Sequence, residues 1–333
     1  MTGDGRRSLA TSVAALVAGI AVLVAVAVAG IGVGAQAVPP VEAVRALVAY
    51  DGSADHMIVR DVRVPRAFLG MAVGAALAVS GALIQTLSRN PLAEPGILGV
   101  TMGAGFVMTV GGALGLAVTS AGELMLSGIG AVLATCLVYA VGRSSPLRLV
   151  LAGVALSAVL SGISLGMRLM LPDVFDRYRF WSVGSLAGRE QSAVALPVTV
   201  IVLALVGALL LGRALNAVAL GETVARTLGA DVVRIRCAAL VLITVLTGAA
   251  TALAGPILFV GLIVPHVARR IVPDSVPWLM AWALVLGPIM LLVADMLSRV
   301  LLPTGEMPVA IVTAFLGGPA LIWAVRRYGT RAL

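Results

Sequence analysis

The segment Leu220-Gly-Glu-Thr-Val-Ala-Arg-Thr-Leu-Gly229 is a polar interruption within a long series of apolar segments. Its spacing predicts a short amphipathic helix, with Glu222 and Arg226 four residues apart and Gly229 as a natural C-cap. The apolar positions share one face of that helix: Leu220, Val224, Ala225 and Leu228. A solvated loop needs no apolar face, so we expect this segment to seat in a groove of a partner protein.

The apolar segments on either side indicate the fold class. Of the 333 residues, 60% are apolar and 11% are charged, and the mean hydropathy is +1.10, which is far outside the usage of soluble proteins. A helix needs roughly 20 apolar residues to cross the bilayer, whereas a membrane barrel would show short alternating segments. We predict an all-α polytopic membrane protein, with one transmembrane domain over residues 1–333. Its ten helices span residues 9–34, 65–87, 95–118, 122–142, 147–170, 192–212, 236–254, 257–270, 276–298 and 307–326.

The basic residues predict how these helices are oriented. The chain contains no lysine, and 14 of its 23 arginines fall on the side that carries both termini if there are ten helices. Arginine is enriched in cytoplasmic loops, so both termini are expected in the cytoplasm. The net charge of +8 is explained by this orientation, and no basic face with interleaved aromatic residues predicts nucleic-acid binding.

The amino-terminal segment resembles a secretory signal in part. Arg6 and Arg7 precede an apolar run, and Ala35-Gln-Ala37 is similar to a cleavage site. The uncharged run from Ser8 to Val41 is much longer than the apolar core of a signal peptide. We therefore expect a retained first transmembrane helix.

Two segments of the chain resemble each other. Leu92-Ala-Glu-Pro-Gly-Ile-Leu-Gly-Val100 is similar to Leu253-Ala-Gly-Pro-Ile-Leu-Phe-Val-Gly-Leu-Ile263, and each follows a helix that ends in a Gly-Ala pair. The two preceding helices are predicted to run in opposite directions. This pattern is typical of an inverted repeat whose proline- and glycine-broken backbone lines a cavity or a protein interface.

Charged residues at the predicted helix ends allow two interpretations. Arg63-Val-Pro-Arg66 places two cations around an exposed helix start, where acidic side chains are usual, which favours an acidic partner. The alternative is that both side chains extend to lipid headgroups. Asp295 lies four residues before Arg299, and we expect an ion pair within that helix rather than a buried ion path.

No set of residues predicts catalysis or metal binding. The two histidines, His56 and His266, are predicted in an outer loop and near the cytoplasmic end of a helix. Asp173 and Asp176 form an isolated DxxD pair, which leaves an intramembrane enzyme as a weak alternative. Without lysine the chain cannot carry the phosphate-binding loop GxxxxGK[ST], so any nucleotide energy must come from another subunit.

These motifs together resemble the FecCD-like permeases of type II ABC importers, the family of the vitamin B12 and ferric-siderophore uptake systems. Several ordered matches at the expected spacing are more specific than any single motif, and they cover nearly the whole chain. The segments that carry the resemblance are Arg63-Val-Pro-Arg66, Gly81-Ala-Leu-Ile-Gln85, Asn90-Pro-Leu-Ala-Glu-Pro-Gly96, Leu151-Ala-Gly-Val-Ala-Leu-Ser157, Leu220-Gly-Glu222 with Leu228-Gly229, Ala254-Gly-Pro256, Val260-Gly-Leu-Ile-Val-Pro-His266 and Glu306-Met-Pro308.

The resemblance implies a set of partners and a place in the cell. A second permease, two cytoplasmic ATPase subunits and an extracytoplasmic binding protein would surround this chain in the bacterial inner or plasma membrane. The chain would not be an enzyme and would bind no cofactor itself, with ATP and Mg²⁺ held by the ATPase subunits. The implied cargo is an iron complex, first a ferric siderophore, then haem, then cobalamin. A proton-coupled secondary transporter that uses Asp295, Glu94 or Glu123 is the alternative.

The resemblance also implies three groups of site residues. Arg63, Arg66 and Arg299 would receive acidic residues of the binding protein. Asn90 and Leu92, together with Pro146 and Leu147, would form the cytoplasmic gate. The coupling residues toward the ATPase would be Leu220, Gly221, Glu222, Ala225, Arg226, Leu228 and Gly229.

Overall fold

Helices are the regular elements of this protein. The computed structural model describes residues 2–34, 38–116, 119–142, 146–188, 191–272, 275–302 and 305–328, and it has no strand among them, which confirms the all-α fold. The tripeptide Ala35 to Ala37 lies outside the described residues. The elements are α1 (Thr2–Gly32), α2 (Pro40–Val48), α3 (Ala54–Met57), η1 (Ile58–Arg63), α4 (Val64–Ser88), η2 (Pro95–Leu98), α5 (Val100–Ala113), α6 (Ser120–Gly142), α7 (Pro146–Met170), α8 (Pro172–Ser182), α9 (Gln191–Ala219), α10 (Glu222–Thr227), α11 (Val232–Ala254), α12 (Val260–Ile271), α13 (Val276–Val300) and α14 (Val309–Tyr328).

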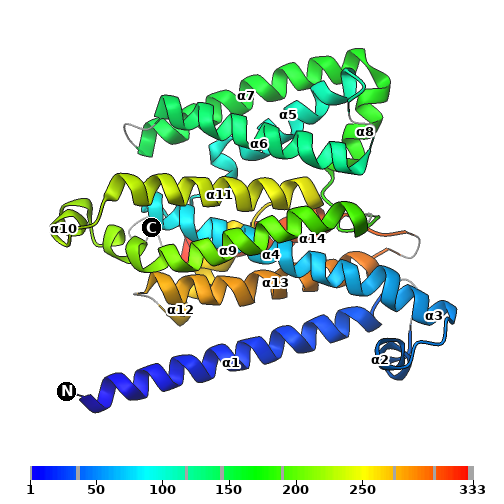
Figure 1. Ribbon diagram of the computed structural model, residues 1–333, viewed down its shortest axis with the longest axis horizontal. Coiled ribbons are helices and arrows are strands. Elements are labelled where there is room, and N and C mark those ends of the chain that lie inside the picture. Colours follow the sequence, from blue (N-terminus) through cyan, green and yellow to red (C-terminus); the bar gives the residue numbers. More distant parts are fainter. Residues whose placement is uncertain are drawn as a thin grey trace.

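The long helices lie side by side, as Figure 1 shows. By length and composition, seven helical runs among the described residues can cross a membrane: α1, the continuous run α3-η1-α4, α6, α7, α9, α11 and α13. Helices α5 and α14 are shorter apolar helices, and α12 has 12 residues. A multi-pass membrane protein is therefore confirmed.

Helix α4 is the centre of the bundle and is buried along most of its length. It packs against α9, α11, α12 and α13. Glycines allow the closest of these approaches. A Cβ atom on Gly74 would lie 2.6 Å from the carbonyl oxygen of Gly287 in α13, and a Cβ atom on Gly81 would overlap the carbonyl oxygen of Gly261 in α12. Small residues thus bring the backbones into direct contact, as is common between membrane helices.

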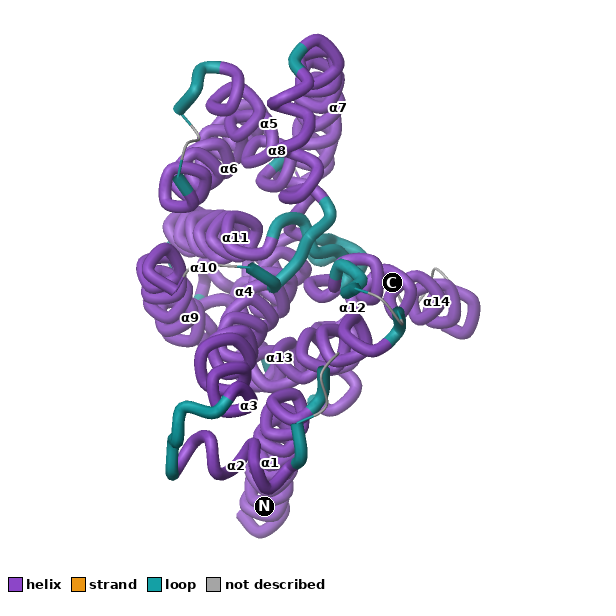
Figure 2. Tube along the Cα trace, turned by 90° about the vertical axis from the view of Figure 1, so that its right-hand side faces the viewer, coloured by secondary structure: helices purple, strands orange, loops and turns teal. Residues whose placement is uncertain are grey.

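The other long helices lie on two sides of this centre. Helix α1 runs along α13 (Figure 2). Gly19 faces the ring of Trp282, and few residues of α1 are buried. On the other side, α5, α6 and α7 pack on one another and reach the centre through α11 (Figure 1). Most of α1 and α7 is consequently left for contact with lipid or another subunit.

Two connections between predicted helices, the one between the first and second and the one between the fifth and sixth, contain helices of their own. In the first of them, α2 buries Ala43 and Ala46 against Val38 and Val59. The hydroxyl of Ser53 then accepts a hydrogen bond from the amide of His56, which caps α3. Helix α3 continues through the π-helical turn η1 into α4. In the second segment, α8 begins with proline in its first turn and buries Val174 and Trp181.

Several helices also end at other residues than the sequence predicted. Helix α9 continues seven residues past Gly212, because the exposed Arg213 can stay helical outside the hydrocarbon. Helix α11 begins at Val232, because the carboxylate of Asp231 accepts a hydrogen bond from the amide of Arg234 and caps it. The third predicted helix is divided into η2 and α5 at Gly99, which has a positive φ of 73°.

Candidate functional site

The three arginines of the predicted docking set lie at one end of the bundle, and two of them contact the carboxylate of Asp295. Arg66 of α4 reaches Asp295 Oδ1 with Nε at 3.0 Å and Nη2 at 2.8 Å. Arg299 of α13 reaches Asp295 Oδ2 with Nη2 at 2.6 Å. The predicted pair between Asp295 and Arg299 is therefore confirmed, and Asp295 also joins α13 to α4 through Arg66.

The remaining donors of this cluster bind Glu306 and the end of α1. Arg66 Nη1 lies 2.6 Å from a carboxylate oxygen of Glu306, which precedes α14. Arg63 Nη1 donates to the carbonyl oxygens of Ile31 and Gly32 at 2.8 and 2.9 Å. Arg299 Nη1 donates to those of Gly30 and Val33 at 3.0 and 2.9 Å. The last carbonyl groups of a helix have no partner within that helix, so these two arginines satisfy the end of α1.

These arginines are buried. The exposed fractions of Arg63, Arg66 and Arg299 are 5%, 8% and 3%. Our expectation of an exposed helix start at Arg63 and Arg66 is wrong, because η1 leads directly into α4 and the end of α1 covers Arg63. The structure brings the predicted docking residues together, and their use by a binding protein stays a prediction.

The predicted coupling segment forms a short helix at the other end of the bundle. Helix α10 follows Gly221 and ends where Gly229, with a φ of 80°, donates from its amide to the carbonyl oxygen of Arg226. Ala225 is buried. Leu220 and Leu228 are 68% and 67% exposed, and Val224 is also exposed. Glu222 begins the helix, and its side chain is outside what the structure describes.

The predicted gate residues are described in part. Arg89 ends α4 in the left-handed conformation, and the side chain of Asn90 then accepts a hydrogen bond from the amide of Leu92 at 2.9 Å. This bond stabilises a turn after the helix. Leu92 is exposed. The backbone of Pro146 and Leu147 begins α7, but their side chains lie outside the described part.

The two similar segments of the predicted repeat meet inside the bundle. A carboxylate oxygen of Glu94 accepts a hydrogen bond from the amide of Phe259 at 3.1 Å. Gln85 of α4 donates to the carbonyl oxygens of Gly261 and Leu262 at 3.3 and 3.2 Å. Gln85, which precedes the first similar segment, and Glu94, which lies within it, thus bind backbone groups at the second. Buried backbone groups inside a membrane protein need such hydrogen-bond partners. The sequence predicted that the helices are interrupted at these two segments, but it did not predict the hydrogen bonds between them.

The other candidate residues do not converge on one another. No group of three or more His, Cys, Asp or Glu residues in the described ranges could hold a metal ion. His56 of α3 lies 2.8 Å from Asp51, and His266 lies 3.1 Å from Arg270 in α12. Asp176 lies 3.4 Å from Arg179 on the surface of α8. These contacts are local and give the residues structural partners.

The sequence and the fold both match known transport proteins. The family model described as the FecCD transport family matches residues 16–327. The chain is 44% identical over 300 residues to the ferric enterobactin transport system permease protein FepD of Escherichia coli, a match that covers 89% of this chain and 90% of that protein. It is 35% identical over 276 residues to the hemin transport system permease protein HmuU of Yersinia pestis, covering 80% and 82% of the two chains.

A solved structure shares the arrangement of the helices. It is described as a putative metal-chelate type ABC transporter in an inward-facing conformation, and it superposes with a TM-score of 0.82 at 27% identity. The match covers 94% of this chain and 98% of that one. The likeness therefore extends over nearly the whole fold.

Proposed function

This chain belongs to the FecCD transport family, and from that premise we propose that it is the permease subunit of an ABC importer for a ferric siderophore. The observation that carries the choice of cargo is the 44% identity, over 89% of the chain, to a permease named for ferric enterobactin. Relatives named for hemin and ferric citrate are 35% and 36% identical, so haem and other iron complexes rank below.

The energy for import comes from separate ATPase subunits in this proposal. Helix α10 supports it, because Leu220, Val224 and Leu228 expose apolar surface on a short segment outside the bundle. Such surface gains free energy when a groove of another protein covers it. The chain itself performs no catalysis and binds no cofactor, and ATP and Mg²⁺ belong to the ATPase subunits. In this proposal α10 and both termini face the cytoplasm.

A binding protein would deliver the cargo at the opposite end of the bundle. Arg63, Arg66 and Arg299 already bind Asp295, Glu306 and the end of α1. Acidic residues of a docking protein would therefore compete with these internal partners for the guanidinium groups. A second permease would complete the pathway, and the exposed apolar residues of α7 and α14 are available to contact it.

The secondary-transporter alternative is less well supported. Asp295 would have to gain and lose protons, yet it contacts two guanidinium groups at 2.6 and 2.8 Å. These contacts occupy both carboxylate oxygens and join α4 to α13, so a relay through Asp295 would have to break structural ion pairs.

Reconstitution of the assembled importer tests the proposal. The chain is co-expressed with the ATPase and binding-protein genes next to its own, purified and placed in proteoliposomes. Uptake of a ferric siderophore, haem and cobalamin is measured with ATP, without ATP and with a pH gradient alone. We expect ATP-dependent uptake of the ferric siderophore. Uptake driven by the pH gradient with no ATPase present would refute the proposal, and ATP-driven uptake of haem or cobalamin alone would refute the choice of cargo.

A further inference from the structure

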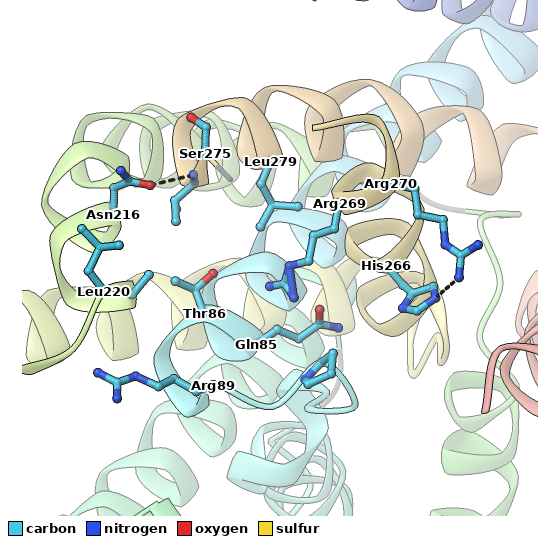
Figure 3. Close-up of a pocket in the computed structure, with 13 residues that line it drawn as sticks. Gln85, Thr86, Arg89, Asn216, Leu220, His266, Arg269, Arg270, Ser275 and Leu279 are labelled. Atoms are coloured by element: carbon cyan, nitrogen blue, oxygen red, sulfur yellow. Dashed lines mark hydrogen bonds between the residues drawn. The ribbon is translucent and has the colours of Figure 1, made fainter. Parts of the chain in front are cut away.

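A polar cavity lies at the end of the bundle that carries α10. It has a volume of about 550 Å³ and is lined by the ends of α4, α9 and α12 and the beginning of α13 (Figure 3). Its apolar wall includes Leu220, Val276 and Leu279, so it adjoins the coupling segment. We call it the basic pocket, because its lining includes Arg89, Arg269, Arg270 and His266 and no carboxylate among the described residues.

The three arginines of the basic pocket are not equivalent. Arg89 donates to the carbonyl oxygen of Val218 at 2.9 Å, and Arg270 contacts His266 at 3.1 Å. Arg269 is partly buried and has neither a hydrogen bond nor an ion pair with any described residue. In Figure 3 its guanidinium points into the middle of the pocket, between Gln85, Thr86 and Leu279.

A second polar group in the same pocket has no partner. The Nε2 atom of Gln85 donates to two carbonyl oxygens of α12, but its Oε1 atom is buried without a hydrogen bond from any described group. Figure 3 shows this oxygen on the pocket side. A buried acceptor and a partly buried cation both gain free energy from a suitable ligand. The pocket therefore offers charge-assisted donors and one acceptor to the same ligand.

Orientation in the membrane alone does not explain Arg269. An arginine that serves only to orient the protein in the membrane can remain in water. Arg213, in the last two turns of α9, is exposed in this way. Arg269 instead enters a cavity, which removes solvent from its charge at a cost in free energy. An anion in the pocket would offset that cost.

We propose that the basic pocket binds a phosphate-bearing anion, with Arg269 as its principal ligand. Arginine binds phosphate with two parallel hydrogen bonds, and basic pockets between the cytoplasmic ends of membrane helices suit phospholipid headgroups. The volume of about 550 Å³ exceeds that of one phosphate group and favours a headgroup with its glycerol. The same chemistry would accept free inorganic phosphate. The proposal does not depend on which iron complex is the cargo.

Thermal unfolding of the full chain in lipid nanodiscs tests the proposal and identifies the source of the phosphate. One series compares phosphatidylcholine with increasing fractions of phosphatidylglycerol, and a second adds inorganic phosphate to phosphatidylcholine discs at constant ionic strength. A ligand that binds the folded state raises the unfolding temperature. Stabilisation by phosphatidylglycerol identifies a lipid, and stabilisation by inorganic phosphate alone identifies the free anion.

Substitutions assign the effect to the pocket. We expect Arg269→Gln to weaken the apparent affinity at least about tenfold, because it removes a charge-assisted bond. Arg269→Lys keeps the charge and should retain most of the binding. Arg213→Gln removes the same charge at an exposed position near the same end of the bundle and should bind as the wild type does.

Three results would overturn the proposal. The first is that neither phosphatidylglycerol nor phosphate stabilises the wild-type chain. The second is equal stabilisation of the wild type and of a folded Arg269→Gln variant. The third is that Arg269→Gln changes only the affinity for the ATPase subunits, which would make an acidic protein segment the occupant. If Arg269→Gln does not fold, Ser275→Glu takes its place, because it adds a negative charge to the lining of the basic pocket. Equal stabilisation of this variant and of the wild type would overturn the proposal.

Discussion

Arg66 and Asp295 are 229 positions apart in sequence and form a buried ion pair of 2.8 Å that joins α4 to α13. The same carboxylate binds Arg299 at 2.6 Å and is completely buried. One acidic side chain thus neutralises two buried cations that come from two helices. Its removal would leave both cations without their main partner.

Substitution of Asp295 should destabilise the fold strongly. Breaking a buried ion pair from one side costs about 3–5 kcal/mol, because an uncompensated charge stays inside the protein. We expect Asp295→Ala to lose an amount of this order in the free energy of unfolding, measured in detergent. Asp176→Ala is the control, since its pair with Arg179 is exposed and should contribute less than about 1 kcal/mol. Equal stability of the two variants would contradict the central role of Asp295.

Because α4 and α12 approach each other closely, replacing glycine by alanine should destabilise the fold at their contact and not at an exposed helix position. A Cβ atom on Gly81 would overlap a backbone carbonyl oxygen of α12, and the helices would have to separate. We expect Gly81→Ala to lower the free energy of unfolding by about 1–3 kcal/mol. Gly162 of α7 is the matched control, because a Cβ atom there meets nothing within 4 Å. Gly162→Ala should be neutral or stabilising by up to about 1 kcal/mol. A larger loss of stability in Gly162→Ala than in Gly81→Ala would contradict the close contact between α4 and α12.

The exposed apolar residues at α10 predict that a polar substitution there should weaken binding of the ATPase subunits without affecting the fold. Leu228 is 67% exposed, and covering a leucine side chain contributes about 1.5–3 kcal/mol. We expect Leu228→Ser to reduce co-purification of the ATPase subunits and ATP-dependent uptake by at least about tenfold. Insertion and thermal stability of the permease should be unchanged. Thr223→Ala, at an exposed position of α10, should retain both the co-purification of the ATPase subunits and the uptake. Full uptake by Leu228→Ser would exclude this leucine from the docking surface.

Chemical labelling tests the proposed orientation. Cys136 and Cys237 are first replaced by serine, and single cysteines are placed at Thr223 in α10 or Val48 at the end of α2. Both positions are exposed in the folded chain. A membrane-impermeant maleimide should label Thr223→Cys only in inside-out vesicles and Val48→Cys only in right-side-out vesicles. The opposite pattern would place α10 outside the cell and remove the basis for coupling to ATPases.

Local patterns in the sequence were sufficient for much of this structure. Apolar length predicted the helices, and the spacing from Asp295 to Arg299 predicted an ion pair that the structure contains. The φ of 80° at Gly229 agrees with its predicted place at the end of α10. These features depend on residues a few positions apart, for which helical geometry is nearly fixed.

Contacts between distant segments could not be predicted in this way. The arginines at Arg63 and Arg66 were expected at an exposed helix start, because nothing local reveals that the end of α1 and Glu306 cover them. The bond from Phe259 to Glu94 joins two breaks that looked alike in sequence but gave no sign of touching. Arg269 fitted the general bias of arginine toward the cytoplasm, and only the cavity around it distinguishes it from Arg213.

The end of α1 has a consequence for how this family can change over time. Two guanidinium groups, those of Arg63 and Arg299, donate to four carbonyl oxygens in or just after the last turn of a helix that buries few of its residues. A homologue without this first helix would remove these acceptors from Arg63 and would leave Arg299 with its ion pair to Asp295. In natural chains without it, the arginine at the position of Arg299 should therefore be retained more often than that of Arg63, because its pair with Asp295 does not depend on α1.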